Sequence, residues 1–167
     1  MILKFKIQNS KFEKSFTLVE ILITISILII LAAIGVYSFR NVQPGLQLSG
    51  VTRELVTDLR YTQQLTIAEQ IEHCLCFFSL DGEYEKKYQI IRCGESDPQC
   101  GEQNPTLVKE KLFPQEIKTL TISEFTNNAV EYNPYGAVKE SGTITLTNIK
   151  DETKIIEVKP SGFVKIK

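Results

Sequence analysis

The chain has 167 residues and a formal net charge of −1, so it can hold one domain and a membrane anchor but hardly two full domains. The charge is unevenly distributed: four lysines and one glutamate precede Phe16, whereas 14 basic and 18 acidic residues follow Arg40. The larger part of the chain therefore lacks the strong basic excess that nucleic-acid binding requires.

A near-continuous apolar run extends from Phe16 to Phe39, and Glu20 is its one charged residue. As a helix, its 24 residues would be about 36 Å long, enough to cross a hydrocarbon core of about 30 Å. By the positive-inside rule, the basic flank before the run predicts a cytoplasmic N-terminus and a translocated C-terminal part. We therefore predict a single transmembrane helix at residues 16–39.

Two simpler interpretations of this run have to be weighed. A cleaved secretory signal would have an apolar core of about 7–15 residues followed by small residues, but this run is longer and ends in the poor cleavage site Val36-Tyr37-Ser38-Phe39. A plain signal anchor fits the length. In a plain anchor, Glu20 would have to snorkel to the interface or take up a proton. Placing a charged carboxylate near the centre of a spanning helix costs roughly 2.5–3.5 kcal/mol, and less near the end of the helix. The remaining explanation is a partner from another chain.

The residues Phe16-Thr17-Leu18-Val19-Glu20, after a basic leader and before a long apolar run, resemble the N-terminus of type IV pilins and pseudopilins. The resemblance implies that residues 1–15 are a prepilin leader, cut by a prepilin peptidase between Ser15 and Phe16, and that Phe16 is then N-methylated. It also implies that Glu20 meets the N-terminal ammonium of a neighbouring subunit during filament assembly. The sequence departs from the family at Ser15, where glycine is usual.

An amphipathic helix is predicted after the membrane segment, from Leu48 to Gln70. Pro44 lies in the polar stretch before it and should end or kink any continuing helix, so residues 40–72 are expected to form a linker and then this helix. Its apolar residues recur at three- and four-residue steps. The apolar stripe would rest on a folded domain; a coiled-coil partner is the alternative, although the run is short for sustained heptads.

Beyond Glu72 the pattern changes to alternation and predicts an extracytoplasmic β domain at residues 73–167. Asp81-Gly82 indicates a hairpin, and Pro134-Tyr135-Gly136 and Ser161-Gly162 read as turns. The fold class is therefore α+β: a long transmembrane helix, an amphipathic helix, and a sandwich-like pair of antiparallel sheets. The expected strands are His73–Leu80, Tyr84–Ile91, Thr106–Leu112, Lys118–Ile122, Val130–Tyr132, Thr143–Ile149, Lys154–Val158 and Phe163–Ile166.

Three stretches of this part, VTRELVTDLRYTQQLTIAEQ, YNPYGAVKESGTITLTN and SGFVKIK, resemble the GspH/FimT family of minor pseudopilins. The resemblance implies a pilin-like fold and a non-enzymatic subunit that joins or primes a filament in type II secretion, pilus biogenesis or DNA uptake. Its partners would be other pilin or pseudopilin subunits, the prepilin peptidase and an assembly-platform membrane protein. It would wait in the cytoplasmic membrane before joining the pilus or pseudopilus. Relatives often have arginine-rich runs where this chain has Gln63-Gln64 and Glu69.

The four cysteines lie in the part expected to be exported, where disulfides persist. Cys93 and Cys100 bracket a loop that turns easily, so they are the candidate disulfide. Cys74 and Cys76 would share one side of a strand; they could pair with each other, pair with the 93–100 region or stay as thiols. A four-cysteine zinc site, with His73 nearby, is disfavoured by the C-x-C and C-x6-C spacing and by the oxidising compartment, so no metal is predicted.

No motif supports an enzyme or a cofactor. His73 is the only histidine, and neither a nucleophile-elbow serine nor a phosphate-binding glycine motif occurs. A filament-tip subunit that contacts DNA or a surface is the second function considered, and a plain signal-anchored β domain is the third. The only local basic excess lies near the C-terminus, where we expect it to protect the outer face of two edge strands. Its members are Lys154, Lys159, Lys165 and Lys167.

Overall fold

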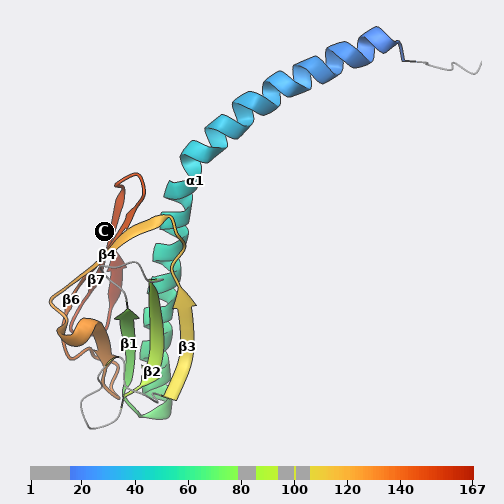
Figure 1. The fold of residues 1–167 in the computed structure, drawn as a ribbon. Helices are drawn as coiled ribbons and strands as arrows, with labels where there is room; N and C mark the ends of the chain where they lie inside the picture. Colours follow the sequence, from blue (N-terminus) through green and yellow to red (C-terminus); the bar gives the residue numbers. More distant parts are fainter. Residues whose placement is uncertain (1–15, 79–85, 94–99, 101–105) are drawn as a thin grey trace, which may run out of the picture. The chain divides into compact units, whose positions relative to one another are not determined.

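The computed structural model describes residues 16–78, 86–93, 100 and 106–167, and it confirms the predicted α+β class. Within these residues a long helix, α1 (Leu18–Glu69), precedes eight strands and one short 3-10 turn, η1 (Thr126–Asn128) (Figure 1). The chain divides into two compact units, the first ending at Asn41 and the second comprising Val42–Lys167. The second half of α1 is therefore part of the same compact unit as the strands.

The linker predicted around Pro44 is absent, because α1 continues without interruption through that proline. Proline has no N–H to donate to the carbonyl four residues earlier and normally breaks a helix interior. Here Pro44 is buried, and the next residue, Gly45, is so close to Glu152 that a Cβ atom would lie 3.0 Å from the Glu152 Oε2. Packing against the domain thus holds the chain helical where its sequence alone indicates a break.

The C-terminal end of α1 is defined by Gln70, one residue beyond the helix. Gln70 adopts a left-handed backbone conformation (φ 55°), as is usual just after a helix C-terminus. Its side-chain Nε2 donates to the carbonyl of Ile67 at 2.7 Å, which satisfies one of the acceptors that a helix end leaves free. The predicted end at Gln70 is correct to within one residue.

The strands form two four-stranded antiparallel sheets. Sheet A has the order β3-β2-β1-β5, and sheet B has the order β4-β6-β7-β8. Figure 1 shows β1, β2 and β3 side by side next to the lower half of α1. The bounds are β1 His73–Phe78, β2 Lys87–Arg92, β3 Thr106–Leu112, β4 Ile117–Ser123, β5 Ala129–Tyr132, β6 Gly142–Asn148, β7 Thr153–Val158 and β8 Val164–Ile166.

Alternation located each of these strands, and Thr106–Leu112 was predicted with its observed bounds. The turn at Pro134-Tyr135-Gly136 is confirmed: the Gly136 N–H donates to the Asn133 carbonyl at 2.8 Å. The turn at Ser161-Gly162 is confirmed by a 2.8 Å bond from the Gly162 N–H to the Lys159 carbonyl. The predicted hairpin turn Asp81-Gly82 lies outside the described residues.

One hydrophobic core lies between the second half of α1 and the inner faces of both sheets. The helix contributes a stripe of buried side chains, as its amphipathic pattern predicts. Burial of each such leucine contributes roughly 1.5–3 kcal/mol, which fixes the helix on the domain rather than leaving it for a coiled-coil partner. The buried helix members are Leu48, Leu55, Val56 and Leu59; sheet A adds Leu75, Ile90 and Tyr132, and sheet B adds Leu120, Ile144, Leu146 and Ile156.

A second, smaller cluster lies on the other face of sheet A and contains the cysteines. Side chains alternate along β1, so Leu75 and Phe77 belong to the main core while Cys74 and Cys76 belong to this cluster. The prediction that Cys74 and Cys76 face the same side is therefore confirmed. Both faces of β1 are covered, and its first five residues are all buried.

The predicted disulfide between Cys93 and Cys100 is wrong. Cys74 is bonded to Cys93 with a Cα–Cα distance of 6.0 Å, and Cys76 is bonded to Cys100 with a Cα–Cα distance of 5.6 Å. The sheet register explains the first bond, because Cys74 pairs with Ile91 on β2 and Cys93 follows two residues later. With all four thiols bonded, none is left for the zinc alternative.

These two bonds give a direct thiol prediction. The variant Cys74→Ser/Cys93→Ser should contain no free thiol under denaturing conditions, because Cys76 and Cys100 remain paired. The matched variant Cys93→Ser/Cys100→Ser should contain two free thiols, because its two substitutions remove the partners of Cys74 and Cys76. Each missing bond should lower the free energy of unfolding by roughly 3 kcal/mol through its loop entropy, measured by denaturant titration. Two free thiols in the first variant would contradict this pairing.

Gly162 occupies a position where no side chain fits. Its φ is +78°, and a Cβ atom there would overlap the Gly136 carbonyl oxygen and the Gln63 side-chain amide. That amide donates to the same Gly136 carbonyl at 2.7 Å, which ties α1 to the turn at residues 133–136. We expect Gly162→Ala to lower the free energy of unfolding by about 2–3 kcal/mol through strain and overpacking.

The matched control for this prediction is Gly50→Ala. Gly50 lies in α1 with no atom near the position of an added Cβ, so alanine should stabilise the helix by about 0.5–1 kcal/mol. Denaturant titration of the two variants beside the parent chain measures both effects. Equal stability of Gly162→Ala and the parent would show that the contact among Gln63, Gly136 and Gly162 is not tight.

Candidate functional site

The predicted assembly residues lie at the start of α1. Phe16 is 73% exposed, and Thr17 precedes the first helical residue, Leu18. The Glu20 N–H donates to the Thr17 Oγ1 at 3.2 Å, which makes Thr17 the N-cap of the helix and Glu20 its third residue. A carboxylate in the first turn also interacts favourably with the positive end of the helix dipole and so stabilises the helix start. Sequence reasoning missed this cap, although the T-x-x-E spacing signals it.

The side chains around these residues in the first unit are exposed. From Leu18 to Val36 every described side chain is exposed, and the stretch is long and apolar enough to cross a membrane. Within the described part of the chain, Glu20 forms no ion pair. Ser15 lies outside the described residues, so cleavage before Phe16 and the assembly role of Glu20 remain predictions.

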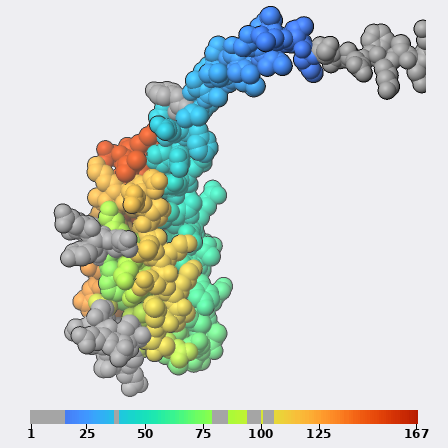
Figure 2. Space-filling view, turned by 45° about the vertical axis from the view of Figure 1, so that its right-hand side comes forward, coloured from blue at the N-terminus to red at the C-terminus, as the bar shows by residue number. Residues whose placement is uncertain are grey.

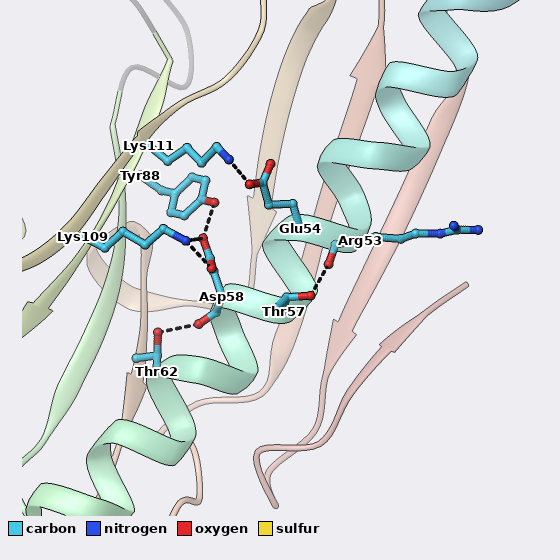
Figure 3. Close-up of polar contacts among 8 residues, drawn as sticks. All are labelled: Arg53, Glu54, Thr57, Asp58, Thr62, Tyr88, Lys109 and Lys111. Carbon is cyan, nitrogen blue, oxygen red and sulfur yellow. Dashed lines mark hydrogen bonds and ion pairs between the residues drawn. The ribbon is translucent and has the colours of Figure 1, made fainter.

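Charged side chains join the second half of α1 to the edge strand β3. Asp58 is only 4% exposed, and its carboxylate accepts hydrogen bonds from Lys109 Nζ at 2.6 and 2.8 Å. The hydroxyl of Tyr88 on β2 donates to the same carboxylate at 2.6 Å. One turn earlier on the helix, Glu54 pairs with Lys111. Figure 3 shows both lysines reaching from β3 toward the two helix acids.

We call these five residues the charged clasp. Positions 54 and 58 share one helix face because they are four residues apart, and positions 109 and 111 share one face of β3 because strands alternate. Figure 2 shows β3, in yellow, alongside this part of the helix. Desolvation by burial raises the pKa of the Tyr88 phenol, and the hydrogen bond to Asp58 raises it further. The phenol therefore remains a donor far into alkaline pH.

The other residues singled out from the sequence have structural positions. His73 is 0% exposed; its Nδ1 contacts the Ile71 carbonyl at 2.8 Å, and its Nε2 lies 3.4 Å from the Glu69 carboxylate. Among the described residues, no three histidine, cysteine or acidic side chains are grouped as metal ligands. The expectation for the C-terminal lysines is wrong for Lys154, because β7 is an inner strand of sheet B and β8 is its edge.

Comparison with known proteins addresses both halves of the chain. Residues 10–36 match the family model of the prokaryotic N-terminal methylation motif. Residues 51–162, more than half of the chain, match the family model described as Type II transport protein GspH. Comparison with curated protein sequences gives no significant match.

Solved structures of minor pilins and pseudopilins share the fold. The type IV minor pilin FimU of Pseudomonas aeruginosa has a TM-score of 0.56 and 14% identity, with 78% of this chain and 92% of FimU covered. The minor pseudopilin EpsH from the Type 2 Secretion System of Vibrio cholerae has a TM-score of 0.53 and 10% identity, with 72% of this chain and 96% of EpsH covered. At these identities the likeness concerns the fold, and the family follows from the sequence match: the chain belongs to the GspH family of type II transport proteins.

Proposed function

We infer that this protein is a minor pilin or pseudopilin, a structural subunit of a type IV pilus-like filament. The observation that carries this conclusion is the combination of two parts in one chain. The first is an exposed apolar helical segment, residues 18–36, that follows Phe16 and has Glu20 as its only charged residue; the second is a GspH-type β domain. A plain membrane anchor needs no carboxylate in its apolar helix, whereas a subunit that assembles through that helix has a use for one.

The proposed assembly step is an ion pair between subunits. The subunit waits in the cytoplasmic membrane with its N-terminus in the cytoplasm, and the prepilin peptidase removes residues 1–15 and methylates Phe16. The new terminal ammonium of one subunit then lies against the Glu20 carboxylate of its neighbour. Two charges that are each costly in hydrocarbon attract strongly where the effective dielectric is low. The pair therefore favours the assembled state over the isolated subunit in the membrane.

The charged clasp has a supporting part in this proposal. Assembly through α1 moves the β domain together with the helix only if the two are rigidly joined. The apolar stripe of α1 supplies most of the adhesion, and the clasp fixes the edge strand β3 against the same helix segment. We propose that the domain thereby keeps one orientation on the second half of α1 as subunits add to the filament through contacts with an assembly-platform membrane protein.

Fractionation of cells that express a tagged copy tests this function. Filaments are sheared from the surface or isolated after overexpression of the major subunit, and the tagged chain is quantified in the filament and membrane fractions. We expect the chain in both fractions of normal cells and in the membrane fraction alone when the prepilin peptidase is deleted. Absence of the chain from the filaments of normal cells, with the major subunit assembled normally, would contradict a filament role.

A further inference from the structure

A basic groove lies between the second half of α1 and the edge strand β8. It has a volume of about 360 Å³ and adjoins a smaller hollow of about 140 Å³, with which it shares Arg53 and Ile166. The larger hollow is lined by Arg53, Val56, Arg60, Lys165 and Ile166 among others, and Lys154 lines the smaller one. We call the two hollows together the basic groove. Neither Phe16 nor Glu20, the residues of the proposed ion pair, lines the groove.

The cations of the groove have no acidic partner in the described part of the chain. Figure 3 shows Arg53 extending away from the charged clasp. The nearby acids on the same helix, Glu54 and Asp58, pair with the β3 lysines and not with Arg53. The Arg60 side chain makes one long hydrogen bond, 3.4 Å from its Nη2 to the Val164 carbonyl. A guanidinium has five N–H donors, so most of its donors remain available.

The carboxylates nearest in sequence to the groove are also in use. Glu157, which pairs in register with Lys165 across β7 and β8, is bonded instead to Lys167 at 3.1 Å. Glu152 accepts from the Asn148 side-chain amide at 2.7 Å. Four cations without a carboxylate thus gather on a part of the chain whose balance is acidic, 14 basic against 18 acidic residues after Arg40.

The walls of the groove are apolar as well as basic. Val56 is buried on the helix side, while Phe163 and Ile166 are exposed on the strand side. Beyond β8 sheet B has no further strand in the described chain. A ligand that fits must offer carboxylates to the guanidinium forks and apolar side chains to these walls.

We propose that this groove binds an acidic segment of a neighbouring pilin-like subunit, with carboxylates and apolar side chains in alternation along an extended peptide. The inference rests on the proposed function for the identity of the partner. Nucleic acid fits less well. Four cations can neutralise only a few phosphates, so few counterions would be released from the nucleic acid. The rest of this net-acidic domain would repel the other phosphates. The groove would add a lateral contact between exported domains to the ion pair that forms inside the membrane.

Binding of a defined probe tests the proposal without any filament. The full chain in zwitterionic detergent micelles is titrated with a fluorescent, capped hexapeptide that alternates glutamate with valine. We expect saturable binding that weakens as salt is raised and becomes about tenfold weaker in Arg53→Gln/Arg60→Gln, which loses two ion pairs. A glutamine–valine peptide of the same length should not bind.

The matched control is Lys87→Gln/Lys118→Gln, which removes the same charge from two sites outside the groove, one half-buried and one exposed. It should bind the acidic peptide as the parent chain does, and all variants should unfold at the parent's denaturant concentration. Absence of binding to the parent chain would overturn the proposal, and so would equal weakening in the control. Tighter, arginine-dependent binding of a 12-base-pair DNA duplex than of the peptide would also overturn it. None of these results bears on the filament function, which the fractionation experiment tests separately.

Discussion

Replacement of Glu20 by alanine should abolish incorporation of the subunit into filaments while its insertion into the membrane persists. Insertion should be easier, because a carboxylate in a spanning helix costs up to roughly 2.5–3.5 kcal/mol. Assembly should fail because the terminal ammonium of the neighbouring subunit loses the only carboxylate in the apolar run. The measurement is the ratio of tagged chain in the sheared filament fraction to that in the membrane fraction, which should fall at least about tenfold if the pair contributes 1.4 kcal/mol or more.

Two further variants separate the charge of Glu20 from its place in the helix. Glu20→Gln keeps the size of the side chain and removes the charge, so it should fail as alanine does. Thr17→Ala removes the N-cap hydrogen bond to the Glu20 N–H at a cost of about 0.5–2 kcal/mol but keeps the carboxylate, so it should still assemble. Normal incorporation of Glu20→Ala would refute the assembly role, and failure of Thr17→Ala alone would assign the effect to the helix start.

Replacement of Asp58 by alanine should be the most damaging single change in the charged clasp. It leaves the Tyr88 hydroxyl and the Lys109 ammonium without the acceptor that holds them at 2.6–2.8 Å. Loss of one partner from a fully buried ion pair costs about 3–5 kcal/mol. Since Lys109 is 39% exposed and can turn to water, we expect a loss of about 2–3 kcal/mol in the free energy of unfolding.

Denaturant titration of the full chain in micelles, followed by circular dichroism, measures this loss. Asp151→Asn is the matched control, because Asp151 also pairs with a lysine, Lys118 at 2.7 Å, but both side chains are largely exposed. Its effect should be at most about 0.5 kcal/mol. If Asp58→Ala and Asp151→Asn had equal effects, the burial and the shared hydrogen bonds of Asp58 would have no energetic consequence.

The elements of the fold could be predicted because each rests on a local pattern. The apolar run, the helical stripe that contains Leu55 and Leu59, and the alternation in Thr106–Leu112 are all visible within a few residues. The break at Pro44 was predicted by the same local logic and is wrong, because the proline is buried against the domain. Local propensity gives way here to tertiary packing, which a single sequence does not display.

The cysteine pairing and the charged clasp depend on contacts that are distant in the sequence. The register of β1 on β2 places Cys74 close to Cys93. The short spacing of Cys93 and Cys100 in the sequence had indicated a disulfide across a local loop. Asp58 and Lys109 are 51 positions apart, and neither residue is unusual in its own neighbourhood. The motif at Phe16 and Glu20 is contiguous, so it can be recognised in the sequence, and a family model matches this part of the chain; the assembly roles of the two residues stay predictions.

The identity of the mature N-terminus tests the central claim of this account most directly. The measurement is the intact mass and N-terminal sequence of the protein isolated from its own membrane. We predict a chain that begins with N-methylated Phe16 and lacks residues 1–15, because the ion pair with Glu20 requires that new ammonium. A mature chain that retains Met1 to Ser15 would contradict the filament-subunit function and would leave a plain signal-anchored β domain as the better description.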